Sequence, residues 1–209
     1  MSAPTIWDEP DADPDTLANL GPLRPMAGMW DSATGQDVHP VEPGAERQVY
    51  VERYELVAID PQTNGPQLLY GLRYHLHIVK PGEVETFHDQ VGYWLWEPAT
   101  GMVLQTLAIP RGQIAMAMGQ ATPDARHFEL RATVGSPTEG IASNPFLIGA
   151  FRTTEFRIAV TIHDEDSWSY EEDTVMEVAG RPEPFHHTDA NTLRRVAPPL
   201  PNPLARRPG

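Results

Sequence analysis

The sequence contains no cysteine, which excludes a disulfide framework, a thiolate metal site and a cysteine nucleophile. Basic residues are also few. Fifteen Lys and Arg stand against 29 Asp and Glu, which gives a formal net charge of −14. Because a surface of this sign repels phosphate backbones, nucleic acid is not expected as a partner.

Long apolar runs are missing as well. No stretch reaches the length of a transmembrane helix, and no positively charged start is followed by an apolar segment. We therefore expect no membrane association and take the cytoplasm as the location. The sequence also lacks a glycine-rich phosphate loop, an HExxH motif, a GxSxG motif and a dinucleotide-binding fingerprint.

The composition that remains favours a packed globular body. Hydrophobic residues make up 40% of the chain, including five Trp and six Tyr. Residues 1–22 are rich in Pro and Asp and predict a flexible arm, with one helical turn near residues 14–20. Proline cannot join a strand ladder, so the Pro-rich residues 197–209 predict an extended tail. The folded domain is expected to span residues 23–196.

Apolar and polar residues alternate along most of this body. In residues 67–79 the apolar positions form one face of a strand, namely Leu68, Tyr70, Leu72, Tyr74, Leu76 and Ile78. Residues 155–178 predict a hairpin with its turn at residues 163–166. Other predicted strands cover residues 47–59, 85–96, 102–108, 112–118 and 127–133.

This succession of short strands predicts an all-β fold with an antiparallel sheet. Such a sheet has to close into a barrel or pack as a sandwich to bury its apolar face. The pattern alone leaves both architectures open. A closed barrel of about eight to ten strands would enclose space for a ligand.

Histidines are the most informative polar residues. His75 and His77, with Glu83 and His88 after them, come close to the metal-binding motif of cupins, although alternation favours a solvent-facing position for the HxH pair. His88 shares a predicted strand face with Gly92, and a glycine within a strand often marks a close approach of a ligand or another backbone. A core or edge histidine is the simpler interpretation of His88.

A second pair, His186 and His187, precedes the last predicted strand. Histidines near a strand end are usually at the surface, and the residues alone favour that position for both. Neutral imidazole is nevertheless a good axial ligand for haem iron.

Three segments together resemble the nitrobindin family, over roughly residues 22–196. The first, "GMWDSATG", matches the family's GxWxGxG segment, and the second, "FHDQVGYWLW", matches its His-x-x-x-Gly-Tyr-Trp strand. The third matches the family's C-terminal ending. The matching positions are Gly28, Trp30, His88, Gly92, Tyr93, Trp94, Gly180, Pro182, His187, Ala190, Leu193, Arg194 and Arg195.

The resemblance implies a closed antiparallel β-barrel of about ten strands, similar to fatty-acid-binding proteins and lipocalins, that binds haem b. It implies His187 as the proximal ligand of the haem iron and places His88 near the haem. Arg152, which shares strand parity with Phe156, is the candidate for a basic residue that points inward and pairs with a haem propionate. An ordinary ion pair at the rim of the barrel is the alternative for Arg152. No catalytic side chain beyond these cofactor-binding residues is implied.

The chain also departs from the family pattern. Ser32 and Thr34 stand where the first segment has later glycines, and one extra residue flanks His187 on each side. Because an insertion in a strand reverses which side chains face inward, His186 could take the role of His187.

The activity that the resemblance implies is isomerisation of peroxynitrite to nitrate on ferric haem. The expected partner is therefore a small molecule, peroxynitrite or nitric oxide, and a homodimer is compatible with the resemblance. One alternative is a non-catalytic carrier of a fatty acid or another apolar ligand. Another is a cupin-type metal enzyme that uses His75, His77 and His88.

Overall fold

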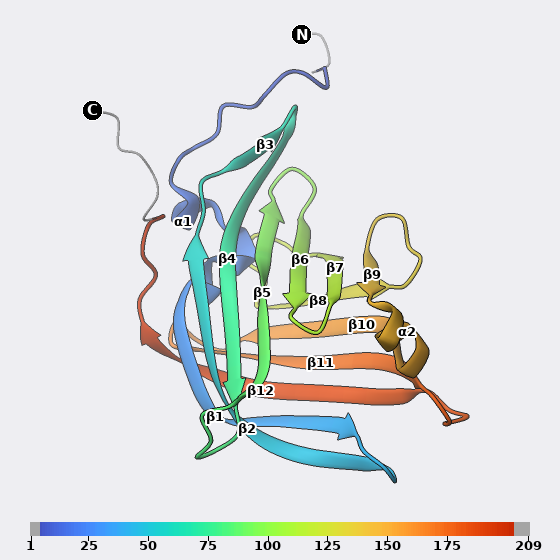
Figure 1. Cartoon of the computed structure of the whole chain (residues 1–209). Helices are drawn as coiled ribbons and strands as arrows, with labels where there is room; N and C mark the ends of the chain where they lie inside the picture. Colours follow the sequence, from blue (N-terminus) through green and yellow to red (C-terminus); the bar gives the residue numbers. More distant parts are fainter. Residues whose placement is uncertain (1–4, 203–209) are drawn as a thin grey trace.

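The computed structural model describes residues 5–202 and consists mainly of β-strands (Figure 1). Its helical segments are short: α1 (Thr16–Asn19), the 3-10 helix η1 (Gly21–Met26) and α2 (Pro145–Ala150). None of the described helices has the length and apolar character needed to cross a membrane. The strands are β1 (Gly28–Pro40), β2 (Ala45–Ala58), β3 (Gln62–Asn64), β4 (Gln67–Val79), β5 (Thr86–Glu97), β6 (Met102–Ile109), β7 (Gln113–Gln120), β8 (His127–Thr133), β9 (Gly140–Ser143), β10 (Phe151–Ile162), β11 (Ser167–Val178) and β12 (Phe185–Ala197).

The strands form a closed antiparallel barrel, as predicted. Within the described residues the sheet order is β2-β1-β12-β11-β10-β8-β7-β6-β5-β4, and a pairing between β2 and β4 closes the ring of 10 strands. β3 extends the β4 edge, and β9 pairs with β7. The seam between β7 and β8 is thin, because Met118 and Arg131 form the one residue pair recorded there.

Two groups of strands cross each other in the barrel wall. Figure 1 shows β4–β7 running across the direction of β10–β12, with β1 and β2 bending to join both groups. A bulge in β1 lies between Ser32 and Gly35, where the register with β2 shifts. Bulges bend strands and increase their twist. The segment that lacks the family's later glycines is therefore the place where β1 turns from one group to the other.

One end of the barrel is closed by η1. Leu20, Leu23 and Met26 are fully buried in the core, and the indole N–H of Trp30 donates to the Met26 carbonyl oxygen at 2.7 Å. The Arg195 guanidinium lies 4.1 Å from the centre of a Trp30 ring. Trp30 and Arg195, two of the residues that carry the family resemblance, thus hold this end shut.

The packed body begins near Thr16 rather than at residue 23. The Thr16 hydroxyl donates to the Ile59 carbonyl at 2.6 Å, and Leu20 belongs to the core, so the segment with α1 is anchored. At the other end β12 runs to Ala197. Residues 1–4 of the predicted arm and 203–209 of the predicted tail lie outside the described residues.

Gly92 packs directly against the neighbouring strand β6. A Cβ atom at this position would lie 1.9 Å from the Thr106 carbonyl oxygen, which is rigid backbone. We therefore expect Gly92→Ala to lower the free energy of unfolding by about 1–3 kcal/mol, as overpacking does. Urea denaturation measures this, and Gly149→Ala is the matched control because nothing lies within 4 Å of a Cβ there. Equal stability of the two variants would contradict the prediction.

Candidate functional site

A cavity of about 410 Å³ opens at the end of the barrel opposite η1. Its volume falls in the range of about 300–1,000 Å³ that is common for small-molecule sites. The end of β1, the starts of β5 and β12, the turn after β6 and helix α2 surround it. Its walls are largely apolar and include Leu76, Ile78, Phe87, Leu107, Ile109, Ile141, Leu147, Phe151, Phe156 and Met176.

Two histidines share one carboxylate at this cavity. His187 Nε2 lies 2.6 Å from Asp37 Oδ1, and His39 Nδ1 lies 2.5 Å from Asp37 Oδ2. Burial alone would raise the pKa of Asp37, but hydrogen bonds and charge interactions with His187 and His39 outweigh burial and lower it. Asp37 is therefore an ionised acceptor that fixes the orientation of His187, whose side chain is 32% exposed.

His88 faces the same cavity from β5. Its Nε2 lies 3.4 Å from Gln90 Oε1. Burial lowers the pKa of His88, and the positive charge of Arg111 lowers it further. His88 is thus a neutral imidazole, and within residues 5–202 its ring forms no hydrogen bond with His187.

Of the two adjacent histidines near the last strand, His187 is the one that lines the cavity. His186 points to the outside, where its Nδ1 lies 2.9 Å from Asp173 Oδ2. His187 pairs with Thr174 of β11, which also lines the cavity. The extra residues around His187 therefore leave its inward orientation intact.

The predicted inward orientation of Arg152 is wrong. Its side chain is exposed and forms an ion pair with Glu177 at 3.2 Å. A register shift between Thr153 and Glu155 reverses the alternation that relates Arg152 to Phe156. Thr153, not Arg152, lines the cavity.

Among the described residues, Arg111 is the Lys or Arg that lines the cavity. It lies in the turn between β6 and β7, lines the cavity and donates from Nη2 to the Phe87 carbonyl at 3.1 Å. Strand alternation could not identify it, because a turn residue has no strand face. The order of strands around the barrel brings this turn beside the start of β5.

The cupin-like histidines lie on the other side of the wall. His75 and His77 are on the outer face of β4, where His75 Nε2 contacts Asp89 Oδ2 at 2.9 Å and His77 Nε2 contacts Thr86 Oγ1 at 3.0 Å. His88 faces inward, so the three imidazoles do not converge. Within residues 5–202 no group of three or more His, Asp or Glu is arranged to hold a metal ion.

A series of hydrogen-bonded polar side chains, Glu52, Tyr170, Tyr50 and Asp189, lies in the barrel interior near the histidines. The Tyr170 hydroxyl donates to Glu52 Oε2 at 2.8 Å, the Tyr50 and Tyr170 oxygens lie 2.9 Å apart, and Tyr50 also contacts Asp189. Three such hydrogen bonds need three hydrogens, and the two tyrosines supply two. One of the two carboxyl groups must therefore carry a proton for the series to be complete.

The pKa values of these acids agree with that count. Burial raises the pKa of Glu52 to about 8. Burial and the charge of Asp37 raise the pKa of Asp189 to about 7, against the hydrogen bond from Tyr50. Glu52 lies among the apolar inward positions of β2, such as Tyr50, Tyr54 and Leu56, so strand alternation carries a signal for a buried acid at this position.

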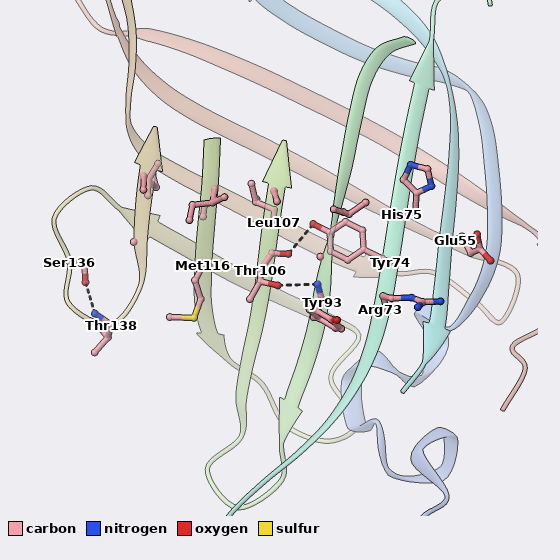
Figure 2. A pocket seen from close by; sticks show the side chains of 18 of the residues that line it. Glu55, Arg73, Tyr74, His75, Tyr93, Thr106, Leu107, Met116, Ser136 and Thr138 are labelled. Atoms are coloured by element: carbon pink, nitrogen blue, oxygen red, sulfur yellow. Dashed lines mark hydrogen bonds between the residues drawn. The ribbon is translucent and has the colours of Figure 1, made fainter. Parts of the chain in front are cut away.

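A larger hollow of about 1,010 Å³ lies on the outer wall (Figure 2). The outward side chains of β4 and β5, such as Arg73, His75 and Tyr93, line it together with the loop that carries Ser136 and Thr138. Within this hollow Thr106 of β6 contacts β5, because its hydroxyl accepts a hydrogen bond from the Tyr93 amide at 3.0 Å. None of the three residues predicted to bind the cofactor, His187, His88 and Arg152, lines this outer hollow. The inner cavity is therefore the candidate site.

Comparisons with known proteins identify a family of haem-binding barrels and a solved structure with a similar fold. The family of THAP4-like, heme-binding beta-barrel domains matches residues 19–195. Among solved structures, the crystal structure of Rv2717c from M. tuberculosis is similar over 88% of this chain and 99% of that chain, with a TM-score of 0.58 and 22% sequence identity. That level of identity supports the fold alone. No curated protein matches the sequence.

Proposed function

This chain belongs to the family of THAP4-like, heme-binding beta-barrel domains, the nitrobindin family, and from that premise we propose that it isomerises peroxynitrite to nitrate on a ferric haem b bound in the inner cavity. His187 would hold the haem iron through a ring nitrogen. The observation that carries the proposal is the position of His187 on the cavity wall, with Asp37 behind its ring.

The residues of the cavity fit a haem. His187 donates from Nε2 to Asp37, and its Nδ1 has no hydrogen-bond partner among the described residues, so one ring nitrogen remains for a metal. A carboxylate behind a ligating imidazole fixes the ring and strengthens it as a donor. The apolar walls suit a porphyrin face, and Arg111 would attract a propionate.

A bound ferric haem would supply the metal centre at which the O–O bond of peroxynitrite breaks and the fragments recombine to nitrate. The chain's own residues position and shield this chemistry. Asp37 orients the His187 ring, His88 stays uncharged beside the cavity, and Leu107 and Phe156 exclude water from its wall.

A carrier of an apolar ligand is the second candidate function, favoured by the same apolar walls. The charges argue against a fatty acid. Asp37 is ionised at the cavity, and Arg111 is the one Lys or Arg among the described residues that line it. A fatty-acid carboxylate would therefore have a single cation to bind and a carboxylate to avoid.

Hemin titration followed by a peroxynitrite assay tests the proposal. We expect a saturable Soret band at one hemin per chain. The loaded protein should speed peroxynitrite decay and raise the yield of nitrate over nitrite, measured by stopped-flow absorbance and ion chromatography. A Soret band without faster decay would reject the isomerase activity. Displacement of a fluorescent fatty-acid analogue, with no Soret band, would identify the carrier.

A further inference from the structure

Glu172 places a carboxyl group in the inner cavity that nothing in the described structure binds. It occupies an inward position of β11 between Tyr170 and Thr174, which also line the cavity. Its neighbours in the sheet are Ile158 of β10 and Asp189 of β12. Among the described residues no hydrogen-bond partner is recorded for either Glu172 oxygen, so the group is available to a ligand.

The surroundings of Glu172 favour its neutral form. Burial raises its pKa well above the ordinary value, and the charges of Asp189 and then Glu52 raise it further. The titratable groups that face it from the packed strands are Glu52, Tyr54, Tyr74, Tyr170 and Asp189. All of these are neutral or negative, so no cation among them stabilises an ionised Glu172. In its neutral form the carboxyl of Glu172 is a hydrogen-bond donor.

Asp37, Tyr170 and Asp189, which also line the cavity, already form hydrogen bonds within the protein. Asp37 accepts hydrogen bonds from His39 and His187, and Tyr170 donates to Glu52. Asp189 is bonded to the Tyr50 hydroxyl. Glu172 differs from these three residues in that neither of its carboxyl oxygens has a hydrogen-bond partner among the described residues.

We propose that Glu172, as a neutral carboxylic acid, donates a hydrogen bond to an oxygen atom of a small nitrogen oxyanion bound in the inner cavity. The choice of a nitrogen oxyanion rests on the proposed function, and the free carboxyl rests on the structure alone. The contact needs no proton transfer, so it leaves the balance of the isomerisation unchanged. A neutral donor beside an anion is attractive, whereas ionised Glu172 would repel the same anion.

The proposal has a definite pH dependence. The donor is present while Glu172 is protonated and is lost as pH rises through its raised pKa. Glutamine at position 172 keeps an N–H donor at every pH. The affinity of wild type for the anion should therefore fall with rising pH, whereas that of Glu172→Gln should not.

Infrared spectroscopy and anion binding test the proposal, with sodium nitrite as the probe on the protein after hemin titration. A carbonyl band of a neutral carboxylic acid should vanish in Glu172→Gln and persist in Glu171→Gln, the control with an exposed glutamate one residue away. The band should shift when nitrite is added to wild type. Glu172→Leu should bind nitrite roughly tenfold more weakly, the size of one lost hydrogen bond.

Two results overturn the role of Glu172. One is a carbonyl band that nitrite leaves unchanged, and the other is nitrite affinity in Glu172→Leu equal to that of wild type. Neither readout is the isomerase activity. Absence of a Soret band would reject the haem proposal separately, because the infrared band can be followed in haem-free protein.

Discussion

Replacing His187 with alanine should abolish the Soret band that hemin titration gives with the wild-type protein. The side chain is the imidazole that lines the cavity with a free ring nitrogen and a carboxylate behind it. Because loss of a hydrogen-bonding partner behind a metal ligand already costs about 10–100-fold in metal affinity, loss of the ligand itself should cost roughly 100-fold or more. Absorbance titration with hemin measures the change.

The adjacent histidine gives a matched control for this experiment. His186 carries the same side chain on the same strand but points outward to Asp173, so His186→Ala should keep the wild-type Soret band. Asp37→Asn should fall between the two, because it removes the charge behind His187 and leaves the ring. Circular dichroism should show the same barrel in all variants. Equal hemin affinity in His187→Ala and His186→Ala would reject the assignment of His187.

Replacing Glu52 with glutamine should remove much of the pH dependence of stability between about pH 5 and pH 8. Burial raises the pKa of Glu52 in the folded protein to about 8, from an ordinary value of 4.5. In this interval the folded chain holds a proton that the unfolded chain releases, so stability falls as pH rises. A shift of this size corresponds to roughly 5 kcal/mol in the free energy of unfolding.

The variant keeps the shape of the buried site. An amide oxygen at position 52 can accept from Tyr170 and Asn191, as Glu52 Oε2 does at 2.8 Å and 2.5 Å. Glu55→Gln is the control, because Glu55 is exposed on the same strand. Denaturant unfolding at pH 5, 6, 7 and 8 should give Glu52→Gln a shallower slope than both wild type and the control. Three parallel slopes would show that Glu52 is not a buried neutral acid.

Much of the fold could be read from local patterns. The alternation in residues 67–79 predicted β4, which spans Gln67–Val79, and the hairpin predicted over residues 155–178 is formed by β10 and β11. These features are local, because alternate side chains of a strand always face opposite sides. Local patterns could not predict the closure of the sheet, because closure depends on the pairing of β2 with β4.

The candidate site could be predicted only in part. The resemblance pointed to His187 and His88, and both line the cavity. It also pointed to Arg152, which a one-residue register shift turns outward. Arg111, Asp37 and Glu172 were missed, since a turn residue and two acids within strands look like surface residues until the strand order is known.

The sequence by itself determined the antiparallel sheet, the apolar face that has to be buried, and the glycine and tryptophan positions that hold the wall together. Only the tertiary structure decided which of two neighbouring histidines faces the cavity and which acids share it. The physical reason is that orientation in a strand reverses with every inserted residue, while proximity across a barrel depends on pairings between segments far apart in the chain. Both are settled when the ring closes, and the charge state of the buried acids follows from that closure.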